Sequence, residues 1–115
     1  MEYRKVVTQY ADAIQYNGEN SLEIKEFILS HLEGEGNEVA FDEKEYNIKF
    51  MRDGNEIIVN KKGILLRIFI QKKGVYQVHH LIDSEYLKAG KNTFTVMTAE
   101  KFEDDWEATE DKTVA

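Results

Sequence analysis

Residues 13–28, AIQYNGENSLEIKEFI, contain an alternating apolar segment, a tight turn and the start of an amphipathic helix. The dipeptide Asn17-Gly18 is typical of a tight turn, because both residues tolerate a positive φ. Asn20 is a favourable N-cap, and Glu23 three residues later completes the spacing of a capping box. Apolar residues then recur at helical spacing until two glycines follow. The pattern predicts a helix over about residues 20–32, the only long helix expected.

The segment before this turn, residues 3–16, is predicted as one strand. Its more apolar face is interrupted by Asp12, which lies between Tyr10 and Ile14 on that face. A buried carboxylate there would need a cationic partner, or its pKa would be raised. The alternative is a bulge or a change of register that turns Asp12 towards solvent.

Beyond the helix the pattern is predominantly β. Residues 46–52 alternate, and Tyr46, Ile48 and Phe50 are expected to face the core. Asp53-Gly54 is expected to form a hairpin turn. Lysine doublets followed by glycine are expected to separate the next strands. The predicted strands in this part of the chain are residues 38–41, 46–52, 56–60, 64–71, 75–82 and 93–98.

These elements predict an α+β domain. About six or seven strands would form a curved, mainly antiparallel sheet packed on the N-terminal helix, with a small barrel as the close variant. Residues 1–108 are expected to form a single domain and residues 109–115 a disordered tail. Residues 99–106 fit either a helix or a strand; Phe102 and Trp106, four positions apart, favour the helix.

The composition restricts the function classes. The chain of 115 residues has 22 acidic and 15 basic side chains, a net charge of −7, which argues against nonspecific binding to nucleic acid or to anionic membranes. A basic protein surface is the partner that such a charge attracts. The absence of cysteine excludes disulfides and thiolate metal sites and fits a reducing compartment. No segment resembles a secretory signal or a membrane span, so we expect a soluble, cytoplasmic protein.

The chain contains no motif that predicts catalysis. His79 and His80 are adjacent on a predicted strand, so they point to opposite faces and are not expected to hold one metal ion. None of the three serines lies in a nucleophile elbow, and no glycine-rich phosphate loop is present. We therefore expect no catalytic residue, no cofactor and no enzymatic activity.

The C-terminal part of the chain is strongly acidic, and two aromatic residues lie within it. It either packs Phe102 and Trp106 on the sheet with the acids solvated, or presents an electronegative surface to a basic protein, in the manner of nucleic-acid mimicry. The candidate partner-binding residues are Glu103, Asp104, Asp105, Trp106 and Glu107.

Residues 1–28 resemble a family of small phage and prophage proteins. The matching residues are Tyr3-Arg4-Lys5, Ala13-Ile14-Gln15-Tyr16, Gly18 and residues 23–27, and more loosely residues 59–63 and Phe102-Glu103-Asp104-Asp105-Trp106-Glu107. The chain departs from the family at Val6, where a proline is usual, and at residues 98–101, which lack one. The resemblance implies a phage accessory protein and carries over no functional residue.

Small acidic phage proteins without enzymatic motifs are often inhibitors of host systems, including anti-CRISPR proteins. The leading expectation is therefore a non-enzymatic protein that binds and inhibits a host protein, such as a nucleic-acid-binding defence effector. One alternative is a binder of a nucleotide signal, with Tyr10, Tyr16, Phe69 or Tyr76 lining an apolar cavity. The other is a virion or assembly component that self-associates through an exposed strand edge.

Overall fold

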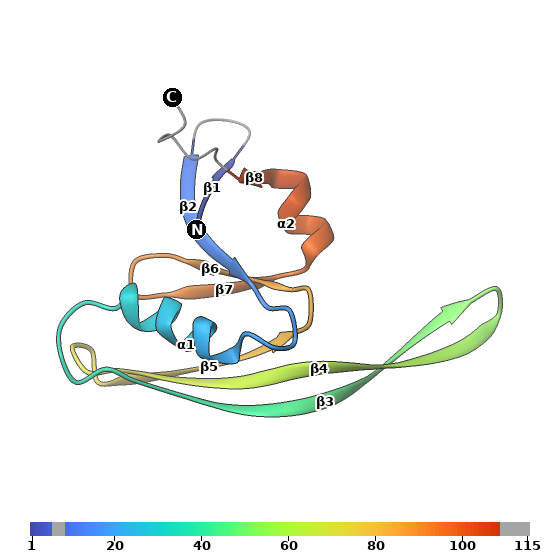
Figure 1. Cartoon of the computed structure of the whole chain (residues 1–115), viewed down its shortest axis with the longest axis horizontal. Helices are drawn as coiled ribbons and strands as arrows, with labels where there is room; N and C mark the ends of the chain where they lie inside the picture. The colour runs from blue at the N-terminus through green and yellow to red at the C-terminus, as the bar shows by residue number, and fades with distance from the viewer. Residues whose placement is uncertain (6–8, 109–115) are drawn as a thin grey trace.

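The computed structural model describes residues 1–5 and 9–108, and these residues form an α+β fold, as expected (Figure 1). The predicted tail, residues 109–115, lies outside the described residues. The elements in chain order are β1 (Glu2–Lys5), β2 (Gln9–Gln15), α1 (Ser21–Ser30), β3 (Glu38–Arg52), β4 (Asn55–Ile70), β5 (Val75–Ile82), β6 (Tyr86–Ala89), β7 (Phe94–Met97), α2 (Ala99–Asp105) and β8 (Trp106–Ala108).

The described strands form two antiparallel sheets, where the sequence predicted one. The first has the order β7-β6-β2-β1-β8, and the second has the order β3-β4-β5. Both sheets end in strands that have one neighbour, so the described strands close no barrel. The described residues contain eight strands where the sequence predicts about six or seven, partly because the predicted strand at residues 3–16 is represented by β1 and β2. These strands, β1 and β2, pair with each other and place Glu2 opposite Asp12.

Helix α1 forms where the sequence predicts a helix, but its start differs in detail. Asn20 occupies the N-cap position, and its backbone carbonyl accepts a hydrogen bond from the Ile24 N–H at 3.0 Å. The Asn20 side chain makes no capping bond to the helix. Its Oδ1 accepts from the Asn17 N–H, and its Nδ2 donates to the Gln15 carbonyl, both at 2.9 Å. The predicted capping box is therefore absent, because Asn20 closes the preceding turn instead.

The larger hydrophobic core lies on one face of the three-stranded sheet, which we call the inner face, and α1 together with β6 and β7 covers it (Figure 1). Alternate residues of a strand face opposite sides of a sheet, and the even-numbered residues of β4 in this region are fully buried. Burial of whole aliphatic side chains contributes about 1.5–3 kcal/mol each. The residues of α1 and β4 in this core are Ile24, Phe27, Ile28, Ile64, Leu66, Ile68 and Ile70.

A smaller core lies beneath α2, which resolves the ambiguity of residues 99–106 in favour of a helix followed by β8. Phe102 is fully buried there. Its ring stacks on Tyr86 with centroids 4.1 Å apart, and Tyr3 meets it edge-on at 4.8 Å. Trp106 stacks on the other side at 6.0 Å. Aromatic packing thus attaches the C-terminal helix to the five-stranded sheet.

The longest feature is the hairpin of β3 and β4, which pair over 15 positions from Glu38–Phe69 to Arg52–Asn55. Its turn is Asp53-Gly54, as predicted, and both turn residues have positive φ, 53° and 78°. The prediction that Lys61-Lys62-Gly63 separates two strands is wrong. β4 runs through these residues, because each of them pairs with a residue of β3.

Candidate protein-binding surface

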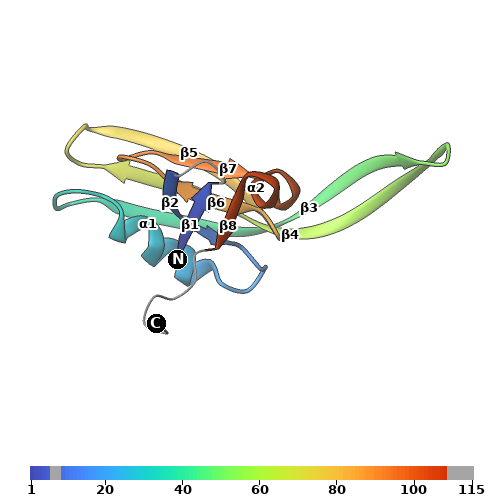
Figure 2. The same cartoon turned by 90° about the horizontal axis from the view of Figure 1, so that it is seen from above.

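Half of this hairpin projects beyond the rest of the molecule. β5 pairs with β4 only from Gly63 onwards, so residues 45–52 and 55–62 form a two-stranded ribbon with no third described strand. We call this ribbon the arm. It extends from one side of the body in both views (Figures 1 and 2), and at about 3.3 Å per residue it is roughly 25 Å long. The radius of gyration is accordingly 15.9 Å, where about 13 Å is typical of a compact chain of this length.

The apolar residues of the arm lie on the face opposite to that of the core residues. In the body, the inner face of β3 carries the odd-numbered Val39 and Phe41, whereas in the arm the apolar positions are even-numbered. In β4 the apolar positions are odd-numbered in the arm and even-numbered in the body. The pairing of β3 with β4 has no bulge, so the apolar residues of the arm and of the body lie on opposite faces of the hairpin. We call the apolar side of the ribbon the apolar face of the arm. It consists of Tyr46, Ile48 and Phe50, paired with Lys61, Val59 and Ile57 respectively.

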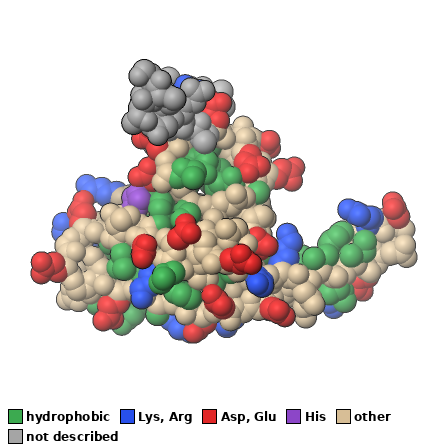
Figure 3. All heavy atoms as spheres, viewed as in Figure 1, with side chains coloured by type: hydrophobic (Ala, Val, Ile, Leu, Met, Phe, Trp, Pro, Cys, Tyr) green, Lys and Arg blue, Asp and Glu red, His purple; other side chains and the backbone are tan. Residues whose placement is uncertain are grey.

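This apolar face is only partly covered. The Phe50 side chain is 38% exposed, and Ile48, Ile57 and Val59 are half-buried by their cross-strand neighbours. The Arg52 guanidinium lies 5.7 Å from the centroid of the Phe50 ring, at the tip of the arm. Figure 3 shows hydrophobic side chains gathered along the projecting arm, with charged groups at its end. The expectation that Tyr46, Ile48 and Phe50 face the core is therefore wrong.

A cleft lies between the root of the arm and the body, and we call it the arm cleft. Ile48 and Lys61 form its wall on the arm side. The opposite wall comes from the segment between β5 and β6 and from the start of α2, and it contains three carboxylates. The residues of this second wall are Ile82, Asp83, Ser84, Glu85, Thr98, Ala99 and Glu100.

The carboxylates of the cleft are not equivalent. Glu85 Oε1 accepts a hydrogen bond from the Ile82 N–H at 2.7 Å, so this side chain shapes the turn after β5. Glu100 is exposed and lies in the first turn of α2. Asp104 is four residues later, so the two carboxylates lie on one side of the helix. They extend the negative charge of the cleft along α2.

The structure separates the five predicted partner-binding residues into two groups. Trp106 is buried in the smaller core, and Lys88 Nζ lies 5.1 Å from the centroid of its ring. Glu103 Oε2 accepts from the Tyr86 hydroxyl at 2.7 Å, and Glu107 forms an ion pair with Arg4. These three side chains contact residues of the five-stranded sheet, although the Glu103 and Glu107 side chains are themselves exposed. Asp104 and Asp105 are also exposed.

The Tyr86–Glu103 contact changes the ionisation of the phenol. Burial removes water from the hydroxyl, and the nearby Glu103 carboxylate disfavours a second negative charge. Both effects raise the pKa of Tyr86 above its ordinary value of 10.0. The hydroxyl therefore stays protonated and acts as a donor to Glu103 at neutral pH.

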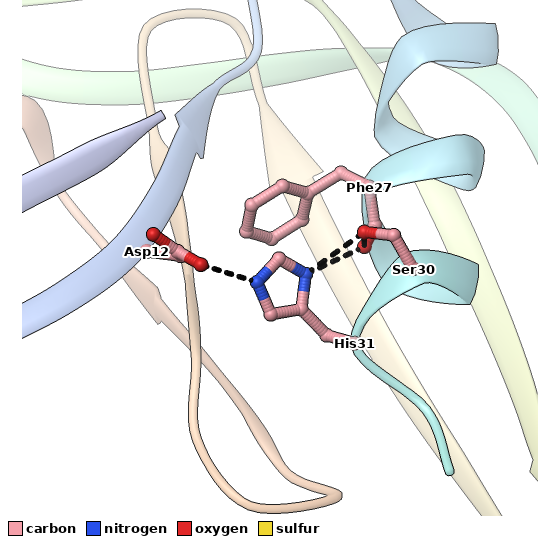
Figure 4. A network of polar contacts seen from close by, with 4 residues as sticks. All are labelled: Asp12, Phe27, Ser30 and His31. Atoms are coloured by element: carbon pink, nitrogen blue, oxygen red, sulfur yellow. Dashed lines mark hydrogen bonds and ion pairs between the residues drawn. The ribbon is translucent and has the colours of Figure 1, made fainter.

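Asp12 is only half-buried, with its side chain 43% exposed, and it pairs with a histidine. Its Oδ2 lies 2.7 Å from His31 Nε2 (Figure 4). The other ring nitrogen of His31 lies 2.9 Å from the Phe27 carbonyl and 3.1 Å from Ser30 Oγ. His31 is the C-cap of α1, so this network ties the end of the helix to β2.

The remaining candidates do not assemble into a second site. His79 is half-buried, which lowers its pKa, whereas His80 is exposed and its Nδ1 lies 2.9 Å from the Tyr46 hydroxyl. Tyr16 is buried in the larger core, but Phe69 and Tyr76 contact each other on the opposite face of the sheet, with centroids 4.8 Å apart. The tyrosines and Phe69 expected to line one cavity are thus divided, and the Tyr10 side chain lies outside the described part.

Among the residues that the structure describes, no group of three His, Asp or Glu side chains is placed to hold a metal ion. No described helix has the length and apolar character needed to cross a membrane. Comparison with protein-family models, curated proteins and solved structures found no match to this chain.

The arm was missed at the sequence level, although a signal for it was present. The apolar positions change from odd to even between Phe41 and Tyr46, and from odd to even again between Val59 and Ile64. A strand that keeps one face on a core keeps its phase. Two phase changes at paired positions of a hairpin therefore indicate that its outer half leaves the core.

Proposed function

We propose that the protein is a non-enzymatic accessory protein of phage or prophage origin that binds and inhibits a host protein. The single observation that carries the binding role is the exposed apolar face of the arm, which projects beyond the body. Apolar surface held away from the core contributes little to stability while it is exposed, and such patches are typical of interaction sites. The phage setting is supported by the resemblance of residues 1–28.

The carboxylates of the arm cleft support a partner with a basic surface. Asp83 and Glu100 lie on the wall opposite Ile48, with Asp104 beyond them on α2. A partner that matches both walls has an apolar segment flanked by lysine or arginine, which is common on nucleic-acid-binding proteins. Complementary charge would accelerate its association, and apolar contact would slow its release. A CRISPR effector or another defence protein is a partner of this kind.

The test compares partner capture by variants of the two walls. Ile48→Lys changes the arm wall, and the double variant Glu100→Lys with Asp104→Lys changes the acidic wall. Each variant is immobilised and incubated with a lysate of the host bacterium, and the retained proteins are quantified by mass spectrometry. Both variants should fail to retain the same protein, one that the wild type retains. The captured protein is then purified, titrated with the accessory protein, and assayed for loss of its own activity.

Matched controls carry the same chemical changes elsewhere. Met51→Lys lies on the other face of the arm, where its side chain is 67% exposed. The double variant Glu35→Lys with Glu38→Lys lies in the loop after α1 and at the start of β3, on the side of the body away from the arm (Figure 1). Both should retain the partner. If the wall variants and the controls capture the same proteins equally well, the proposed function is wrong.

A further inference from the structure

The arm has a second unpartnered feature, which is the outer edge of β4. In an antiparallel strand the N–H and C=O of one residue point to the same side, and successive residues alternate. The Lys62 carbonyl accepts from the Asp83 N–H at 2.9 Å, so the backbone N–H and C=O of Lys62 point away from β3. Because the register has no bulge, the backbone groups of Glu56, Ile58 and Asn60 point to the same side. No described strand pairs with this edge over residues 55–62.

We propose that this edge pairs with the same edge of a second copy of the chain, antiparallel about a two-fold axis near Ile58. The pairing would place Ile58 opposite Ile58 of the second copy, and Ile57 opposite its Val59. The two arms would then form one four-stranded sheet. A two-stranded ribbon is marginally stable in water, whereas three or more strands are needed for independent stability.

The side chains of the segment are complementary to themselves in this arrangement. Ile58 is 56% exposed on the face of the arm opposite its apolar face, and the two-fold axis gives it an apolar neighbour. Glu56 and Lys62 lie on the same face at opposite ends of the segment. In an antiparallel pair, Glu56 of one copy lies diagonally across from Lys62 of the other, a distance that long side chains span. No two like charges lie directly opposite, because Glu56 faces Asn60 and Asn55 faces Lys61.

The apolar faces of the two arms would also join. Antiparallel pairing about a two-fold axis perpendicular to the sheet leaves corresponding faces on the same side. The Ile57 and Val59 side chains of both copies would therefore meet at the centre of one continuous apolar surface. This assembly goes beyond the proposed partner-binding function and does not depend on it.

Light scattering coupled to size exclusion tests the assembly. At a protein concentration of about 100 μM we expect a mass of twice the 13.4 kDa of one chain. Ile58→Asp puts two carboxylates face to face at the axis and should weaken the dimer at least about tenfold. The matched control, Met51→Asp, alters the same face on the strand away from the axis and should remain dimeric. The side chains of both positions are exposed, and circular dichroism checks that both variants fold.

A cysteine variant gives an independent readout, because the natural chain has no cysteine. Directly opposite residues in a hydrogen-bonded pair have Cα atoms about 5.5 Å apart, within the range of a disulfide. Oxidised Ile58→Cys should therefore form a covalent dimer on a non-reducing gel. Met51→Cys would lie three strand spacings, roughly 14 Å, across the sheet from its mate and four residues, roughly 13 Å, along it, and should not form a disulfide.

Two results would overturn the proposal. One is a monomeric protein at all concentrations tested, and the other is a dimer that Ile58→Asp leaves intact. A monomer that still captures a host protein through the arm cleft would leave the proposed function standing. A dimer whose wall variants capture the same proteins as the wild type would contradict only that function.

Discussion

The ring of Tyr46 lies against the backbone of Gly63, where the arm joins the body. A Cβ atom added to Gly63 would lie 2.4 Å from Tyr46 Cε2 and 3.1 Å from the Leu81 carbonyl oxygen. The Tyr46 hydroxyl is also held by His80 Nδ1 at 2.9 Å. The glycine thus provides the space in which an aromatic ring fixes the root of the arm.

Gly63→Ala should therefore destabilise the protein by about 1–3 kcal/mol, as overpacking does in well-filled sites. The ring would have to move and lose its contact with His80. Urea unfolding followed by circular dichroism measures the loss. In the Tyr46→Ala background the same substitution should cost much less, because the ring is gone; an equal cost in both backgrounds would refute the explanation.

Alkaline pH should destabilise the fold through Tyr86. Its pKa is raised in the folded chain, so above pH 10 the unfolded chain loses this proton while the folded chain keeps it. The unfolded state then binds fewer protons, and the free energy of unfolding falls by up to about 1.4 kcal/mol per pH unit for this one group. Below pH 10 the group contributes no slope.

Urea unfolding of the wild type and Tyr86→Phe between about pH 9 and pH 11 checks this expectation. The variant should have a shallower pH dependence over this window. The matched control is Tyr76→Phe, which removes a hydroxyl from a side chain that is 72% exposed. A Tyr86→Phe profile parallel to that of the wild type would contradict the assignment.

Trp106 should matter for stability and not for partner contact. Trp106→Ala removes a buried ring stacked on Phe102, and losses of about 3–5 kcal/mol are typical of such truncations. Asp104→Lys, on the exposed side of α2, should change the free energy of unfolding by less than about 0.5 kcal/mol. Trp106 is the only tryptophan, so its fluorescence follows the unfolding of this core directly in Asp104→Lys. Circular dichroism serves for Trp106→Ala.

The Asp12–His31 pair is half-exposed, which limits its contribution. Asp12→Asn removes the charge but retains an oxygen that can accept a hydrogen bond from His31. We expect a loss of less than about 1 kcal/mol, the usual range for partly exposed pairs. Thermal unfolding at low and high salt measures it. The loss should shrink at high salt, which screens exposed charges; a loss of several kcal/mol would show that the pair is a buried structural element instead.

The local signals in the sequence predicted the elements that depend on neighbouring residues. The helix α1 is set by the spacing of its apolar residues, and the turn at Asp53-Gly54 by the tolerance of both residues for a positive φ. The side chain of Asn20 was harder to predict, because its alternative partners in the turn compete with the helix N–H groups. The same short sequence is compatible with an Asn20 side chain that caps the helix and with one that closes the turn.

The features that the sequence did not predict depend on long-range pairing. Lys61-Lys62-Gly63 reads as a turn in isolation, but a β3 strand on one side keeps it extended. The contacts of Glu103 and Glu107 depend on Tyr86 and Arg4 respectively, which lie far away in the chain. Spacing within the segment contains no information about either contact.

The pairing of β1 with β8 has a consequence for the order in which the chain folds. The register places Tyr3 opposite Ala108, whereas the β3–β4 hairpin closes about a two-residue turn and is complete at Ile70. During synthesis the hairpin can form while the C-terminal strand is still inside the ribosome. The first strand made can pair with β2 early, but its second neighbour, β8, is made last. The five-stranded sheet therefore becomes complete only when the last described residues emerge.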